Sequence, residues 1–233
     1  MQKNLVLVPG LNNTRMVFAR TLAALPPSVR GIGVDCPPLS SVEAIAEALL
    51  PVLPKRFWLG GFSFGGYVAL ALLESVPERI EGIALICSAP YSDSPEQREK
   101  RRISMATARE GRYFDMIEAQ AASAFHPSNL QDADLMSERR VMVRAYGVER
   151  YLAHVQAVID RPDRSRLLDG SKPTLVVCGS HDRVFPEEVL RQVALGVPGA
   201  ELRVVAAAGH LVPLEQPRKL VRALTDWMGV GTS

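Results

Sequence analysis

A serine inside a glycine-rich turn is the first feature of this sequence that could do chemistry. Ser63 stands at the centre of Gly61-Phe62-Ser63-Phe64-Gly65, which fits the G-x-S-x-G pattern of a nucleophile elbow. In such a turn a strand passes sharply into a helix, and glycine fits on either side because it has no Cβ to meet the neighbouring backbone. The helix directs free N–H groups and its positive dipole end toward the serine, where negative charge develops during acyl transfer. The pattern therefore predicts that Ser63 is a nucleophile.

The residues on both sides of the turn support this role. Residues 56–59 form a short apolar run, as expected for a buried strand, and residues 67–73 continue as an apolar helix. These flanks matter because a five-residue pattern of glycine and serine also arises by chance in loops. We therefore expect Ser63 to lie between a strand and a helix.

Two further residues could activate this serine. A serine hydroxyl is a poor nucleophile at neutral pH, so it needs a base within hydrogen-bond reach and an acid that orients the base. His210 follows the last predicted strand, and Asp182 follows the strand before it. Because sites form at the edge where the carboxyl ends of parallel strands meet, we predict a catalytic triad of Ser63, Asp182 and His210. His181, next to Asp182, is the alternative base.

The oxyanion formed during acyl transfer needs preorganised hydrogen-bond donors. One predicted donor is the backbone N–H of Phe64, the residue after the nucleophile. The other is the N–H of Leu11, in the loop after the first predicted strand. Asn12 is a candidate for contact with the substrate from the same loop, whereas Asn13 or Thr14 suits the cap of the next helix.

The overall composition excludes several classes of partner. The chain has 233 residues, of which 47% are hydrophobic and 22% are charged, and its formal net charge is +2. That charge gives no basis for binding nucleic acid or an anionic membrane surface. No apolar run approaches the length of a transmembrane span or of a signal peptide's apolar region, so we expect a cytoplasmic protein without a membrane partner.

Cysteine usage agrees with that expectation. The chain has three cysteines, and Cys87 and Cys178 stand at the ends of apolar runs, so we expect reduced, buried thiols. The sequence contains neither C-x-x-C nor H-E-x-x-H, so no metal site is predicted. The serine chemistry requires no cofactor.

The order of the apolar runs predicts an α/β fold. Up to about residue 87, strands and helices alternate, which implies a mostly parallel sheet with helices on both faces. Strands near residues 174–178 and 201–205 bring the sheet to about six. Residues 90–170 have helical spacing and are predicted to form an inserted cap of four helices, with breaks near Gly111, His126-Pro127 and Gly147. The core is then residues 1–89 and 171–233.

These segments together resemble the α/β-hydrolase superfamily, over nearly the whole chain. The resemblance is carried by residues 8–11, 61–66, 77–80, 173–182 and 209–217. It implies the triad order Ser, Asp, His along the chain, as found here. Two departures stand out. Pro9-Gly10 replaces the His-Gly of many relatives, and the chain begins almost directly at what is usually the third strand, so we expect the fold to lack the first two strands.

The resemblance also restricts the reaction. Epoxide hydrolases and haloalkane dehalogenases of this fold use an aspartate nucleophile, and Ser63 argues against both. The serine members imply a hydrolase that cleaves a small carboxylic ester, lactone or thioester through an acyl-enzyme. The alternatives are a carbon–carbon hydrolase, perhydrolase or lyase with the same triad, or a non-catalytic ligand-binding protein on this fold.

The helical region is expected to supply the walls of the substrate pocket. Its candidate lining residues are Phe114, Phe125, Met142 and Tyr146, which together with Asn12 favour a small ester-like substrate. The basic residues of this region are read as a solvated helix face, or alternatively as a site for an acidic carrier protein or a carboxylate-bearing substrate. They are residues 98 and 100–102, Arg139, Arg140 and Arg144.

Overall fold

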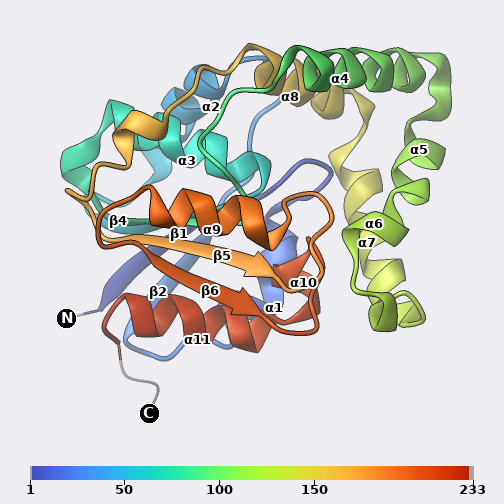
Figure 1. The fold of residues 1–233 in the computed structure, drawn as a ribbon. Helices are drawn as coiled ribbons and strands as arrows, with labels where there is room; N and C mark the ends of the chain where they lie inside the picture. Colours follow the sequence, from blue (N-terminus) through green and yellow to red (C-terminus); the bar gives the residue numbers. More distant parts are fainter. Residues whose placement is uncertain (1, 231–233) are drawn as a thin grey trace.

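A single six-stranded parallel sheet forms the centre of the computed structural model, which describes residues 2–230. The strand order is β2-β1-β3-β4-β5-β6, and every neighbouring pair is parallel. The strands are β1 (Lys3–Val8), β2 (Val29–Gly33), β3 (Phe57–Phe62), β4 (Ile80–Ile86), β5 (Thr174–Gly179) and β6 (Glu201–Val205). The predicted α/β fold is confirmed (Figure 1).

The apolar character of the inner strands explains their central position. All six residues of β5 are buried, as are most residues of β1, β3 and β4, because helices cover both faces of the sheet. Successive residues of a strand face opposite sides. Accordingly, Val6 and Val8 of β1 join one apolar cluster, and Leu5 and Leu7 join the other.

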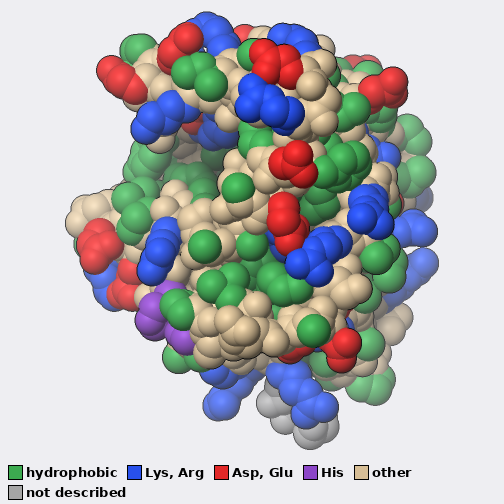
Figure 2. Space-filling model, turned by 90° about the vertical axis from the view of Figure 1, so that its right-hand side faces the viewer, with side chains coloured by type: hydrophobic (Ala, Val, Ile, Leu, Met, Phe, Trp, Pro, Cys, Tyr) green, Lys and Arg blue, Asp and Glu red, His purple; other side chains and the backbone are tan. Residues whose placement is uncertain are grey.

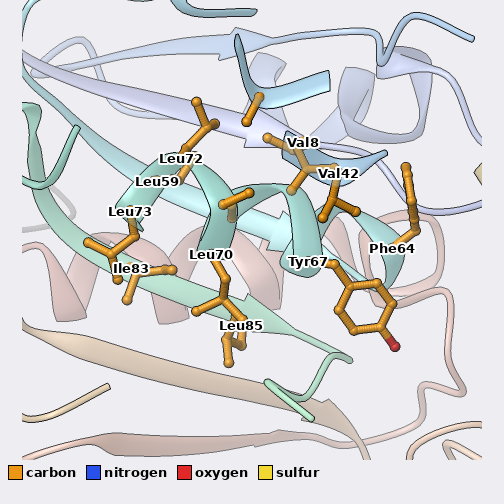
Figure 3. Packing of buried hydrophobic residues seen from close by; sticks show 14 of the residues in the cluster. Val8, Val42, Leu59, Phe64, Tyr67, Leu70, Leu72, Leu73, Ile83 and Leu85 are labelled. Atoms are coloured by element: carbon orange, nitrogen blue, oxygen red, sulfur yellow. The ribbon is translucent and has the colours of Figure 1, made fainter. Parts of the chain in front are cut away.

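Helices α2 (Val42–Leu49), α3 (Phe64–Ser75) and α9 (Glu187–Leu195) pack on one face of the sheet. Figure 3 shows Leu70, Leu72 and Leu73 of α3 among side chains of β1, β3 and β4. The opposite face is covered by α1 (Ala19–Ala23), α10 (Val212–Glu215) and α11 (Pro217–Trp227). Short 3-10 turns complete this part at Arg15–Phe18, Leu50–Val52, Pro77–Arg79 and Ser165–Leu167.

The chain between β4 and β5 is helical and lies beside the carboxyl ends of the strands (Figure 1). Its helices are α4 (Pro95–Thr107), α5 (Tyr113–Ala119), α6 (Ala121–Ala124), α7 (Ala133–Tyr146) and α8 (Val148–Asp160), with a π turn at Ala108–Arg112 and a 3-10 turn at Pro127–Asn129. Gly111 and Gly147 have positive φ at two of the expected breaks. Four helices were expected, and the additional break falls at Gln120, between α5 and α6.

No helix within residues 2–230 is both long and apolar enough to cross a bilayer.

Candidate active site

Ser63 lies between β3 and α3 in a conformation that few residues adopt. Its φ is 51° and its ψ is −118°, a strained combination for a residue with a Cβ. The two flanking glycines must lack side chains, because a Cβ on Gly61 would lie 2.4 Å from the Gly65 carbonyl oxygen and one on Gly65 would lie 2.1 Å from the Val8 carbonyl oxygen. The close packing of β1, β3 and α3 therefore holds Ser63 at the tip of the turn.

The loops after β5 and β6 bring an acid and a base to this serine. The Ser63 Oγ lies 3.0 Å from His210 Nε2, and His210 Nδ1 lies 2.9 Å from Asp182 Oδ2. Because an ionised carboxylate only accepts, Nδ1–H donates to Asp182, which leaves Nε2 to accept the Ser63 proton. The three predicted residues thus form one hydrogen-bonded chain that could activate the hydroxyl.

Asp182 is held in place as an ionised acceptor. Its Oδ1 accepts the backbone N–H groups of Val184 at 2.8 Å and Phe185 at 2.9 Å. Burial raises the pKa of Asp182, but His210 and these two N–H groups outweigh burial, so the pKa lies below its ordinary value. A carboxylate that stays charged suits the task of orienting a histidine.

The cysteines do not offer a competing nucleophile or a metal site. All three are buried, and burial raises the pKa of Cys36 and of Cys178 to about 12. Within residues 2–230 only Cys87, Asp182 and His210 gather as potential metal ligands. Burial and Asp182 raise the pKa of the Cys87 thiol well above its ordinary value, and the other two side chains already bond each other, so this set does not suit a metal ion.

The backbone N–H groups of Leu11 and Phe64 are free to bind an oxyanion. Both residues line the same cavity as Ser63. Neither N–H donates to a protein acceptor within the described chain, residues 2–230. The Leu11 loop is fixed by Asn12, whose φ is 63° and whose Oδ1 accepts the Tyr113 hydroxyl at 2.9 Å. Of the two candidate caps, Thr14 is the one whose side chain accepts the N–H of the next turn.

One residue that supports the base was missed from the sequence. Glu215 Oε1 accepts the Gly209 N–H at 2.8 Å, while Oε2 accepts the His126 N–H and the Asn129 Nδ2–H, each at 2.7 Å. Glu215 thereby joins the loop of His210 to the helical segment. The only sequence signal is its short spacing from His210, across the single turn of α10.

A cavity of about 270 Å³ opens above the serine, between the strand ends and the helical segment. Asn12 lines it, as predicted. Polar side chains are well represented among its walls, which include Asn13, Tyr67, Arg101, Gln120, Ser123 and Arg139 beside Phe62, Ile117, Val143, Val158, Val184, Phe185 and Leu211. Figure 2 shows a hollow in the face of the molecule formed by the helical segment, with acidic and basic side chains mixed around it.

The other four candidate pocket residues do not line this cavity. Phe114 is 48% exposed and lines an outer depression, because α5 turns Ile117 rather than Phe114 inward. Phe125 and Met142 are buried in the cluster that includes α10 and α11. Tyr146 packs inside the helical segment and donates its hydroxyl to His154 Nδ1.

Comparison with known proteins identifies the family to which this sequence is similar. The sequence model described as the alpha/beta hydrolase family matches residues 5–223. An uncharacterized hydrolase of Bacillus subtilis, YugF, is 24% identical, covering 97% of this chain and 90% of its own length. A pimeloyl-[acyl-carrier protein] methyl ester esterase of Photobacterium profundum is 26% identical, covering 97% and 94%. The structure of a thermophilic esterase from Thermogutta terrifontis, with malate bound, is 28% identical with a TM-score of 0.90, covering 98% and 90%.

Proposed function

The chain belongs to the alpha/beta hydrolase family, and on that premise we propose that it is a serine hydrolase that cleaves small carboxylic esters. The observation that carries this proposal is the continuous chain of hydrogen bonds from Ser63 through His210 to Asp182, with contacts of 3.0 and 2.9 Å. Similarity to an esterase structure at 28% identity supports the same reaction class.

The reaction divides into acylation and hydrolysis of the acyl-enzyme. His210 Nε2 takes the proton of Ser63 Oγ as that oxygen attacks the ester carbonyl carbon. The N–H groups of Leu11 and Phe64 stabilise the oxyanion. The imidazolium then gives its proton to the departing alcohol, and an ester between Ser63 and the acyl group remains.

Water completes the cycle by the same route. His210 removes a proton from a water molecule that attacks the acyl-enzyme carbonyl, and a second oxyanion forms between the two N–H groups. As this intermediate collapses, the bond to Ser63 Oγ breaks, the His210 imidazolium gives its proton to that oxygen, and the carboxylic acid is released. Asp182 stays ionised throughout and stabilises the imidazolium each time it forms.

Residues 90–170 act in this proposal as a cap that selects the substrate. The cavity volume of about 270 Å³ suits a small acyl or alcohol group. Val143 lines both this cavity and the outer depression, so the cap places the two spaces back to back.

A chain-length series of p-nitrophenyl esters tests the proposal. We expect hydrolysis of short acyl esters and a fall in kcat/KM as the acyl chain outgrows the cavity. Ser63→Ala should lose at least about 10³-fold in kcat. Ser104→Ala is the matched control, since Ser104 lies on α4 outside the cavity lining and donates its hydroxyl to the Lys100 carbonyl. Equal activity of the Ser63→Ala and Ser104→Ala variants would contradict the proposal.

The outer depression supports a second candidate, an ester or thioester carried by an acidic carrier protein. Its lining residues are Phe114, Asp115, Glu118, Arg140, Val143 and Arg144, and Arg140 pairs with Glu118. The relative from Photobacterium profundum is named for a carrier-linked ester. Reversing both charges with Arg140→Glu and Arg144→Glu should then raise KM for a carrier-linked ester and leave p-nitrophenyl acetate hydrolysis unchanged. An unaltered KM and salt dependence on the carrier-linked ester would remove this candidate.

A further inference from the structure

A buried cluster with more positive than negative groups reaches the wall of the active-site cavity. Asp93 accepts Arg161 Nη2 at 2.8 Å on one oxygen and the Nε of Arg101 on the other. The side chains of Asp93 and Arg161 are 3% and 5% exposed, and that of Arg101 is 29% exposed. Within residues 2–230, no second carboxylate lies within ion-pair distance of either arginine. Two guanidinium groups therefore share one carboxylate, which leaves one positive charge uncompensated.

The two arginines of this cluster have different amounts of unused bonding capacity. Each of the three guanidinium nitrogens of Arg161 has an acceptor, because Nε and Nη1 donate to the carbonyls of Tyr91 and Val158. Arg101 uses Nε for Asp93 and places Nη2 at 3.4 Å from the same carboxylate. Its Nη1 has no acceptor in the described chain, residues 2–230, and Arg101 lines the cavity. Arg101 thus has N–H groups without an acceptor on the wall of the cavity that contains Ser63.

A tyrosine hydroxyl joins this donor from the nucleophile helix. Tyr67 follows Ser63 by four residues, and Figure 3 shows its side chain extending from α3 with the hydroxyl at the far end. The ring is 5% exposed and lies under the Arg161 guanidinium, whose Cζ is 3.9 Å from the ring centroid. Its hydroxyl lacks a hydrogen-bond partner among residues 2–230, although Tyr67 lines the cavity. Burial raises the pKa of Tyr67, so the hydroxyl keeps its proton and is a donor.

The rest of the cavity wall adds no negative charge. Among residues 2–230, its walls include Arg101 and Arg139 but no aspartate or glutamate. Arg139 already donates to Glu118 and to the Ile117 carbonyl, so Arg101 is the more available of the two arginines for binding a substrate anion. An uncompensated charge in a partly desolvated site is unfavourable, and an anion bound by an arginine fork relieves it.

We propose that Arg101 and Tyr67 form a subsite that binds a carboxylate carried by the substrate, so that the preferred substrates are esters with a second, anionic carboxyl group. This inference rests on the proposed esterase reaction, which supplies the place where the ester carbonyl must lie. A substrate that spans Ser63 and this subsite is held at both ends, which favours the geometry of attack.

A pair of esters that differ only in one terminal group tests the subsite. Mono-p-nitrophenyl glutarate and p-nitrophenyl valerate have acyl chains of equal length, with a carboxylate and a methyl group at the end. We expect wild-type protein to favour the glutarate ester in kcat/KM. Arg101→Gln should lower kcat/KM for the glutarate ester by about 10- to 100-fold, since a hydrogen bond to a charged group is worth that much, and change the valerate ester little.

Further variants separate binding from structural damage. Tyr67→Phe should reduce the preference by a few-fold, and Arg101→Lys should retain part of it because the charge remains without the planar fork. Arg102→Gln is the matched control, since Arg102 is the next residue of α4, is 58% exposed and pairs with Glu99. It should leave both substrates unaffected. A second pair, 4-acetoxybenzoate and 4-methylphenyl acetate, places the carboxylate on the alcohol side.

The outcomes distinguish this inference from the esterase proposal. An Arg101-dependent preference for the anionic ester in either pair supports the subsite. If Arg101→Gln lowers kcat/KM equally for the anionic and the neutral ester of each pair, or leaves the ratio of the two kcat/KM values unchanged in both pairs, the proposed subsite is wrong. The esterase proposal is unaffected by that result. If wild-type protein hydrolyses neither ester, the esterase proposal fails, and calorimetric titration with glutarate decides the subsite: binding lost in Arg101→Gln supports it, and equal or absent binding overturns it.

Discussion

The ring of His154 stacks on the ring of Phe64, with centroids 4.7 Å apart and planes inclined by 20°. Phe64 carries one of the two N–H groups proposed to bind the oxyanion, and His154 belongs to α8 of the helical segment. His154 Nε2 lies 2.7 Å from the Pro37 carbonyl oxygen, which can only accept, so the ring proton is on Nε2 and Nδ1 accepts from Tyr146. A neutral histidine thus joins the helical segment, the loop after β2 and the turn that holds Ser63.

The buried state of His154 predicts how stability depends on pH. Burial lowers the pKa of His154 from 6.5 to about 4. Between about pH 6.5 and pH 4 the unfolded chain therefore binds a proton at His154 that the folded chain does not bind. Stability consequently falls as pH falls through this window and levels off below it. The contribution lost is roughly 3 kcal/mol. The free energy of unfolding, measured with urea at several pH values, should depend less steeply on pH in His154→Gln than in wild type. An identical pH dependence in variant and wild type would contradict this account.

The turn around Ser63 should not accept a larger residue. Gly65→Ala would place a Cβ 2.1 Å from the Val8 carbonyl oxygen, which is backbone and cannot rotate away. We expect a loss of stability of about 1–3 kcal/mol and a loss of esterase activity, measured by urea unfolding and ester hydrolysis. Gly196→Ala is the control, because its nearest contact would be 3.4 Å away. A Gly65→Ala variant as stable and active as Gly196→Ala would show that the turn is looser than described.

Glu215 should matter to activity although it does not touch the proposed substrate site. In Glu215→Gln one acceptor oxygen becomes an NH₂ group that faces an N–H donor, so at least one of three partly buried hydrogen bonds is lost. We expect a destabilisation of about 1–3 kcal/mol and a lower kcat, because the loop of His210 loses its anchor. Glu138→Gln provides the comparison, since Glu138 pairs with a half-exposed Arg20 on the surface and should cost almost nothing. Equal effects of the two variants would count against the anchoring role.

Asp182, the acid of the proposed triad, should affect catalysis far more than folding. Asp182→Asn keeps the side-chain shape and one oxygen for the Val184 and Phe185 N–H groups, but it removes the charge that orients His210. We expect kcat to fall by about 10³- to 10⁴-fold with only a small change in the urea midpoint. A kcat within about 10-fold of wild type would mean that another group orients the base.

Much of the site could be predicted from the sequence because it depends on strand order. Ser63, Asp182 and His210 each follow a strand, and parallel strands bring their carboxyl ends to one edge whatever the intervening sequence is. Glycine on both sides of Ser63 indicated the sharp turn, because no other residue fits there. These signals are local in the sequence, and the parallel sheet brings the three residues close together in space.

The orientation of the helices within residues 90–170 could not be predicted in the same way. Arg139 and Arg140 are neighbours in a basic run, yet the Arg139 side chain is 7% exposed and that of Arg140 is 51% exposed. Adjacent helical residues point about 100° apart, and only the packing of α7 on α5 decides which one faces the cavity. The same long-range packing turns Phe114 outward and Ile117 inward, and it places Arg101 beside Asp93.

Labelling with a fluorophosphonate tests the central claim most directly, since this reagent phosphonylates a serine only when a base activates it and an oxyanion site receives the reagent. Wild-type protein should gain one adduct by intact mass, and peptide mapping should place it on Ser63; Ser63→Ala should gain none. Folded wild-type protein that remains unlabelled at Ser63 would contradict the account.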